Sequence, residues 1–154
     1  MNSETDALKE LYTTVIDSRD GYEKAAEVVD SPRLQSLFEE LQKRRARHAS
    51  ELREYLTSAD IDLEDDGTIL ASAHRQYLGL KDKVSDDDAA VVAEVIRGER
   101  QLLDAYDQAI RPMDASSPAF SFATEQHRNL EAHIEELELF AEDNDTPSTR
   151  REIA

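Results

Sequence analysis

The chain of 154 residues is long enough for one domain with a substantial core and too short for two ordinary domains. Its formal net charge of -17 argues against nucleic acid and anionic membranes as partners, since both would have to be met by clustered Lys and Arg. The absence of cysteine excludes disulfides, thiolate metal ligands and cysteine nucleophiles, so any metal site would have to use oxygen and imidazole.

The remaining composition predicts an all-α protein. Four glycines, four prolines and no tryptophan accompany many strong helix formers, whereas a sheet would need runs of Val, Ile and Thr. The sequence has no secretory signal pattern and no stretch approaching about 20 apolar residues, so we expect a cytoplasmic location. It also has no Gly-rich phosphate loop and no nucleophile elbow, which argues against conventional kinases and hydrolases.

The first predicted helix covers roughly residues 3–29, where apolar side chains recur every three or four positions and define one buried face. Asp30, Ser31 and Pro32 then interrupt the pattern. Ser31 can cap a second helix over about residues 32–57, with Pro32 at its first position. Because the connection is short, these two helices should be antiparallel neighbours.

The second predicted helix has apolar side chains near both ends and a basic centre. Residues 34–41 and 52–56 fit one buried stripe, whereas the inward positions between them fall on Arg44 or Arg45 and then on His48. We therefore expect a polar layer halfway along this helix.

The next segments predict a long return of the chain. Residues 58–67 are an acidic linker, and residues 68–84 resume a helical rhythm that predicts a crossover helix. Such a helix would return the chain by about 25 Å, so that the third main helix would run parallel to the second. We predict the third main helix over about residues 85–110 and the fourth from residue 118 to about 142.

Two helical hairpins joined by a crossover helix are typical of a ferritin-like four-helix bundle. We therefore predict a single all-α domain of this kind over residues 1–142. Residues 143–154 are polar, and we expect this tail to be disordered.

Glu99 is the most informative residue of the sequence, because it lies on the apolar stripe of the third main helix with Val95, Ile96, Leu102 and Tyr106. A carboxylate at such a position needs a buried partner, which is either a metal ion or a cationic side chain.

A di-iron or di-manganese centre would need single carboxylates from two helices and a Glu-x-x-His pair from each of the other two. Glu23 and Glu99 fit the single-carboxylate positions, on the first and third main helices. His48 and His133 fit the histidine positions, on the second and fourth. These four residues are the candidate metal ligands.

The carboxylate expected three residues before each histidine is absent, since Arg45 and Leu130 occupy those positions. Glu51 and Glu136 follow the histidines at the same spacing and give a reversed pair that could still hold Zn²⁺ or Fe²⁺. Arg45 is the stronger objection, because a permanently charged guanidinium repels divalent cations and can donate hydrogen bonds to Glu99. We therefore favour a buried layer of ion pairs formed by Arg44, Arg45, His48 and Glu99.

Several short stretches carry a resemblance to a known family: Asp20 to Glu27, Ala71 to Arg75, Arg97 to Glu99, Tyr106 and His133. From about Leu8 to Tyr106 the chain resembles an uncharacterised bacterial family of ferritin-like four-helix-bundle proteins, known mainly as a domain of unknown function. The resemblance implies a ferritin-like fold and a bacterial cytoplasmic setting, and it implies no reaction, substrate or cofactor. His48 departs from the family, in which an apolar or aromatic residue is more usual.

These observations lead to three functional interpretations. We favour a non-catalytic bundle, stress-associated or self-associating as a homo-oligomer, that uses no cofactor and whose polar layer fixes the register of the helices. The alternative is a di-metal protein that oxidises Fe²⁺ or handles peroxide with iron or manganese. A third interpretation is an adaptor that presents its acidic helices to a basic protein partner.

Overall fold

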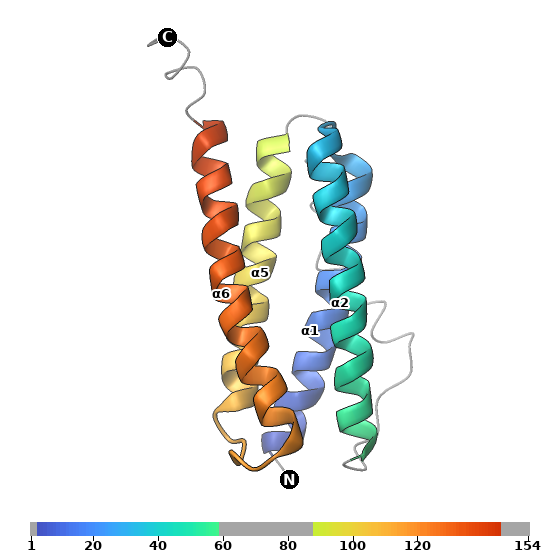
Figure 1. Cartoon of the computed structure of the whole chain (residues 1–154), viewed down its shortest axis with the longest axis vertical. Helices are drawn as coiled ribbons and strands as arrows, with labels where there is room; N and C mark the ends of the chain where they lie inside the picture. The colour runs from blue at the N-terminus through green and yellow to red at the C-terminus, as the bar shows by residue number, and fades with distance from the viewer. Residues whose placement is uncertain (1–2, 59–87, 146–154) are drawn as a thin grey trace.

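The computed structural model describes residues 3–58 and 88–145. These residues form four helices and no strand: α1 (Ser3–Val28), α2 (Pro32–Ser58), α5 (Asp88–Ile110) and α6 (Pro118–Asp145). The helices lie lengthwise beside one another as a helical bundle (Figure 1). The prediction of an all-α fold is therefore confirmed for these residues. The predicted acidic linker and crossover helix lie outside the described residues, apart from Ser58 at the end of α2.

The helices form two hairpins that meet along α1 and α5. α1 packs against both α2 and α5, and α5 also packs against α6, whereas α2 and α6 touch at few positions. The carboxylate of Asp88 accepts the backbone N–H groups of Asp30 and Ser31 at 2.9 and 3.0 Å. α5 therefore begins beside the start of α2 and runs in the same direction, as the length of the intervening segment predicted (Figure 1). α1 and α6 both begin at the opposite end of the bundle.

Capping side chains explain where the helices begin. Ser31 Oγ accepts the N–H of Leu34 at 3.2 Å, which makes Ser31 the predicted N-cap of α2 with Pro32 in the first position. Before α6, the Asp114 carboxylate accepts the N–H of Ser116 at 3.0 Å and the chain turns into Pro118. That hydrogen bond, with a second one from the Ser116 hydroxyl, lowers the pKa of Asp114.

The helices end close to the predicted positions. α1 ends at Val28, α2 at Ser58 and α5 at Ile110. α6 continues to Asp145, a few residues beyond the predicted end of the domain, and residues 146–154 of the predicted tail lie outside the described residues.

The buried apolar side chains form two clusters, one toward each end of the bundle. One cluster gathers the first half of α1, the second halves of α2 and α5, and the first part of α6. The other gathers the second half of α1, the first halves of α2 and α5, and Leu137 of α6. Between the clusters, the inward positions of α1, α2 and α5 are held by Ser18, Arg45 and Glu99. The polar layer predicted for the middle of α2 thus lies between two apolar cores.

None of the four described helices combines the length and the apolarity that crossing a membrane requires.

Candidate functional site: a buried ion pair and an arginine-lined cleft

Glu99 lies in the core, and its side chain is only 2% exposed. The carboxylate accepts hydrogen bonds from three side chains on two other helices. Oε2 lies 2.5 Å from Nη2 of Arg45 and 2.5 Å from the hydroxyl of Tyr22. Oε1 accepts from the Ser18 hydroxyl at 3.3 Å. Both oxygens of this buried carboxylate are therefore engaged within the protein, which offsets the cost of removing it from water.

Arg45 of α2 supplies the positive charge that balances the carboxylate of Glu99. Its guanidinium also donates from Nε to the Ser18 hydroxyl at 3.0 Å, and its Cζ lies 5.7 Å from the centre of the Tyr22 ring. Burial opposes the charge, yet the carboxylate of Glu99 holds the pKa of Arg45 above its ordinary value. Arg45 therefore remains charged in the core.

The sequence of α1 places the two hydroxyl donors on one face. Ser18 and Tyr22 are four residues apart, so both side chains point from α1 toward Glu99 of α5. Gly21 is buried beside them and lines a very small cavity with Val95 and Glu99. Because Gly21 has no side chain, the carboxylate can lie close to α1 at this point.

His133 completes the arrangement from α6. Its Nε2 lies 3.3 Å from the Tyr22 hydroxyl and 3.6 Å from Oε2 of Glu99. Burial lowers the pKa of His133, against the opposing effect of Glu99 and with a further lowering by Arg45. A neutral imidazole can donate its Nε2 proton to the Tyr22 oxygen, while Tyr22 donates to Glu99. We call the five residues the Glu99 cluster: Ser18, Tyr22, Arg45, Glu99 and His133.

The structure does not bring together the four predicted metal ligands. Glu23 is exposed on α1, because one residue along a helix turns a side chain by about 100° and the buried position falls on Tyr22. The two additional candidates also point outward, since Glu51 is exposed and the Glu136 side chain is 80% exposed. Of the predicted ligands, Glu99 and His133 are neighbours.

Arg44 also departs from its predicted place in the buried layer. Its side chain is 44% exposed, and its guanidinium lies 3.7 Å from the carboxylate of Glu40 on the outside of α2. The neighbouring Arg45 takes the buried position, one turn after Leu41 and one turn before Ala49.

The donors around Glu99 do not fit a divalent metal ion. Arg45 donates to Oε2, and its fixed positive charge would repel a cation brought to the same oxygen. Within residues 3–58 and 88–145, no group of three or more His, Cys, Asp or Glu side chains could hold a metal. The arrangement therefore supports an ion-pair cluster in place of a metal centre.

A cleft of about 280 Å³ lies between α2 and α6, two helices that touch at few positions. Arg45 and His133 lie at its boundary with the Glu99 cluster. Two more arginines of α2, Arg44 and Arg47, line it as well. Tyr106 of α5 lines it too, and no partner for its buried hydroxyl is found in the part of the chain that the structure describes.

His48 lies in this cleft and outside the Glu99 cluster. Its ring packs edge-on against Phe122 of α6, with the ring centres 6.0 Å apart. Burial, followed by the positive charges of Arg45, Arg44 and Arg47, lowers the pKa of His48 to about 4. His48 is therefore neutral at neutral pH.

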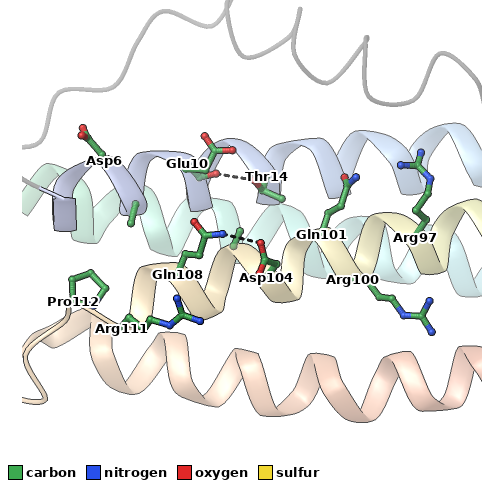
Figure 2. Close-up of a pocket in the computed structure, with 12 residues that line it drawn as sticks. Asp6, Glu10, Thr14, Arg97, Arg100, Gln101, Asp104, Gln108, Arg111 and Pro112 are labelled. Carbon is green, nitrogen blue, oxygen red and sulfur yellow. Dashed lines mark hydrogen bonds between the residues drawn. The ribbon is translucent and has the colours of Figure 1, made fainter.

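A larger groove, of about 1220 Å³, follows α1 and α5 on another face (Figure 2). Asp6 and Glu10 of α1 line it. Arg97 and Arg100 of α5, and Arg111 of the loop that follows α5, line it as well. Each of these arginines has an acidic partner: Arg97 pairs with Glu94, Arg100 with Glu138 and Arg111 with Asp107. The charges along the groove are therefore mixed and largely paired, and we assign no ligand to it.

Sequence reasoning missed Ser18 and did not assign Tyr22 a partner. Both residues lie on the stripe that continues from Val15, so the helical spacing contained the signal. The metal-centre hypothesis considered only carboxylates and histidines as ligands, and it therefore selected Glu23 and not Tyr22.

The fold and the site together define an all-helical bundle built around a buried arginine–glutamate pair. Residues 3–112 match the model of a family described as a domain of unknown function (DUF2383), and the chain belongs to that family. Comparison with the curated proteins and with the solved structures gives no match. The matched region includes four members of the Glu99 cluster, whereas His133 and the α6 side of the cleft lie beyond it.

Proposed function

We propose that this protein is a ferritin-like helical bundle with a non-catalytic role, in which the Glu99 cluster fixes the register of the helices. The observation that carries the proposal is the buried pair of Arg45 and Glu99, which joins α2 to α5 between two apolar cores. A helix that slipped by one turn would leave both charges unpaired among apolar side chains, which is strongly unfavourable. A single buried polar position fixes register in coiled coils by the same principle.

The order of the helices supports the ferritin-like part of the proposal. α1 with α2 and α5 with α6 form two hairpins, and α5 runs parallel to α2 after a long intervening segment (Figure 1). An up-down-up-down bundle would instead have α5 antiparallel to α2.

Single substitutions test whether the pair is needed. Glu99→Gln leaves the guanidinium of Arg45 buried without its counter-charge. Arg45→Met leaves the carboxylate of Glu99 buried without its counter-charge. Each should lower the free energy of unfolding by about 3 to 5 kcal/mol, measured by urea denaturation. The matched control is Lys24→Met with Glu27→Gln, which removes a pair on α1 whose side chains are 37% and 59% exposed, and it should change stability by less than about 1 kcal/mol.

The double substitution Arg45→Met with Glu99→Leu separates register from stability. It fills the layer with apolar side chains and should regain most of the lost free energy of unfolding. If the pair fixes register, the amide NMR spectrum of this double variant should show additional or broadened signals. A single sharp set of signals, as in the unsubstituted protein, would contradict the register role.

Metal content tests the non-metal part of the proposal. Elemental analysis of protein purified without chelator should give no stoichiometric iron or manganese, and Glu99→Gln should not change that content. A stoichiometric metal that Glu99→Gln removes, with oxygen consumption on adding Fe²⁺, would overturn the proposal in favour of the di-metal alternative.

A further inference from the structure

The cleft between α2 and α6 has an unusual charge for this protein. The whole chain carries 35 acidic and 18 basic residues, yet three arginines of α2 line the cleft and no Asp or Glu is among its described lining residues. Arg45 is balanced by Glu99, and Arg44 lies 3.7 Å from the exposed Glu40. For Arg47, no ion pair occurs within the described residues. The cleft is therefore a local concentration of positive charge.

The cleft also holds neutral groups that can donate hydrogen bonds. The Tyr106 hydroxyl is buried at its lining without a partner among the described residues, and a buried donor in this state is costly unless something accepts from it. Gln126 and Asn129 of α6 add side-chain amides, and His48 and His133 add ring nitrogens. The available groups are mostly donors, so the complementary ligand is rich in acceptor oxygens.

We propose that this cleft binds a small tetrahedral oxyanion, namely inorganic phosphate or the phosphate group of a small phosphorylated molecule. Guanidinium groups match the oxygens of phosphate in paired hydrogen bonds, and a bound anion would balance the charge of Arg47, for which no ion pair occurs within the described residues. The volume of about 280 Å³ is at the small end of ligand pockets, which limits the ligand to a few groups beyond the phosphate. This site is separate from the structural role of the Arg45–Glu99 pair.

The rest of the molecule argues against a polyanion at the same place. The net charge of -17 repels extended phosphate backbones, whereas a small ion needs to approach the cleft alone. The cleft lies between two helices, so it admits a compact group more readily than a duplex.

The test is a titration of the protein with inorganic phosphate, in which the NMR signals of the His48 and His133 rings report binding. Sodium chloride keeps the ionic strength constant, so that general screening does not contribute. The signals should shift and saturate. Arg47→Gln should weaken the affinity by about tenfold, as expected for loss of one charge-assisted hydrogen bond.

Two further variants make the test specific. Lys43→Gln makes the same change in charge at an exposed position on α2 outside the cleft, and it should change the affinity less than about twofold. Tyr106→Phe removes the buried hydroxyl while keeping the ring, and it should weaken binding in the same direction as Arg47→Gln.

Each outcome decides the matter. Shifts that fail to saturate, or equal weakening by Lys43→Gln and Arg47→Gln, would overturn the proposal, as would acetate binding as tightly as phosphate. Tighter binding of glycerol phosphate than of inorganic phosphate would identify a phosphate ester as the preferred form, and the reverse order would identify the free ion. The stabilities of the Arg45 and Glu99 variants are measured without phosphate, so they judge the register role separately.

Discussion

Arg45 and His48 lie three residues apart on α2, and burial disfavours the charged form of both, yet only Arg45 has an acidic partner among the described residues. Arg45 keeps its charge because Glu99 lies against it, whereas His48 has three arginines as neighbours and no acidic partner in the described structure. The same helix therefore presents a charged side chain to the core and a neutral imidazole to the cleft. An anion bound in the cleft would change the surroundings of His48 far more than those of Arg45.

The lowered pKa of His48 predicts a loss of stability in mild acid. Its pKa is about 4 in the folded protein and about 6.5 when the chain is unfolded, so between these values the unfolded chain binds the extra proton. The contribution is fully present above pH about 6.5 and is lost as the pH falls toward 4. Allowing for the partial exposure of the ring, the loss should be about 1 to 2 kcal/mol.

Urea denaturation of the unsubstituted protein and of His48→Gln, at pH 7.5 and 4.5 in buffers without phosphate, measures this loss. Other groups of the protein also bind protons on acidification, so the informative quantity is the difference between the two proteins. The His48→Gln protein should lose less stability on acidification. Equal losses in the two proteins would show that His48 does not titrate as the structure indicates.

At this scale the sequence predicted the buried acid better than its partners. The apolar residues on either side of Glu99 lie on one face of the helix, so that face can be buried only if Glu99 is buried with it. Arg44 and Arg45 both follow Leu41 at a helical spacing, three and four residues later, and the packing of neighbouring helices decides which of them is buried. Periodicity cannot supply that information, because it describes one helix at a time.

Among the helices, the contact between Asp88 and the α1–α2 connection links the first hairpin to the second. The carboxylate accepts two backbone N–H groups, from Asp30 and Ser31, and it also lies in the first turn of α5, where a negative charge is favourable. Asp88→Ala should lower the free energy of unfolding by about 1 to 2 kcal/mol.

Hydrogen exchange locates the effect of this substitution. The amides of Asp30 and Ser31 should exchange about tenfold faster in Asp88→Ala, while amides in the middle of α1 keep their rates after correction for global stability. Asp88→Asn retains one acceptor oxygen and should give an intermediate result. Unchanged exchange at both amides would contradict the contact.

The ends of the helices were predictable because local chemistry sets them. Ser31 with Pro32, and Pro118 at the start of α6, fix helix starts within a few residues of chain. Faces that meet another helix were less predictable: the helical spacing of Phe120, Ala123, Leu130 and Ile134 favours Phe120 as the inward residue, yet Phe122 is buried and Phe120 is only partly buried. The ring of Phe122 packs against His48 and Tyr55 of α2, so the choice depends on a neighbouring helix and not on the spacing within α6 alone.

The whole molecule combines a compact bundle with a formal net charge of -17. Like charges on its surface repel one another more in the folded state than in the expanded unfolded chain. Exposed pairs such as Lys24 with Glu27 offset little of this repulsion.

Salt should therefore stabilise the protein. Raising sodium chloride from about 0.02 M to about 0.5 M, which shortens the screening length severalfold, should raise the melting temperature by several degrees. Circular dichroism melts at several salt concentrations measure this, with sodium fluoride as a second salt. A melting temperature that falls or stays constant in both salts would show that surface repulsion is unimportant.

The direction of the helices has a practical consequence for engineering. Because α1 starts at one end of the bundle and α6 finishes at the other, a head-to-tail fusion would join opposite ends of two bundles. A circular permutant would need a linker that spans the height of the molecule, about 40 Å for a helix as long as α6.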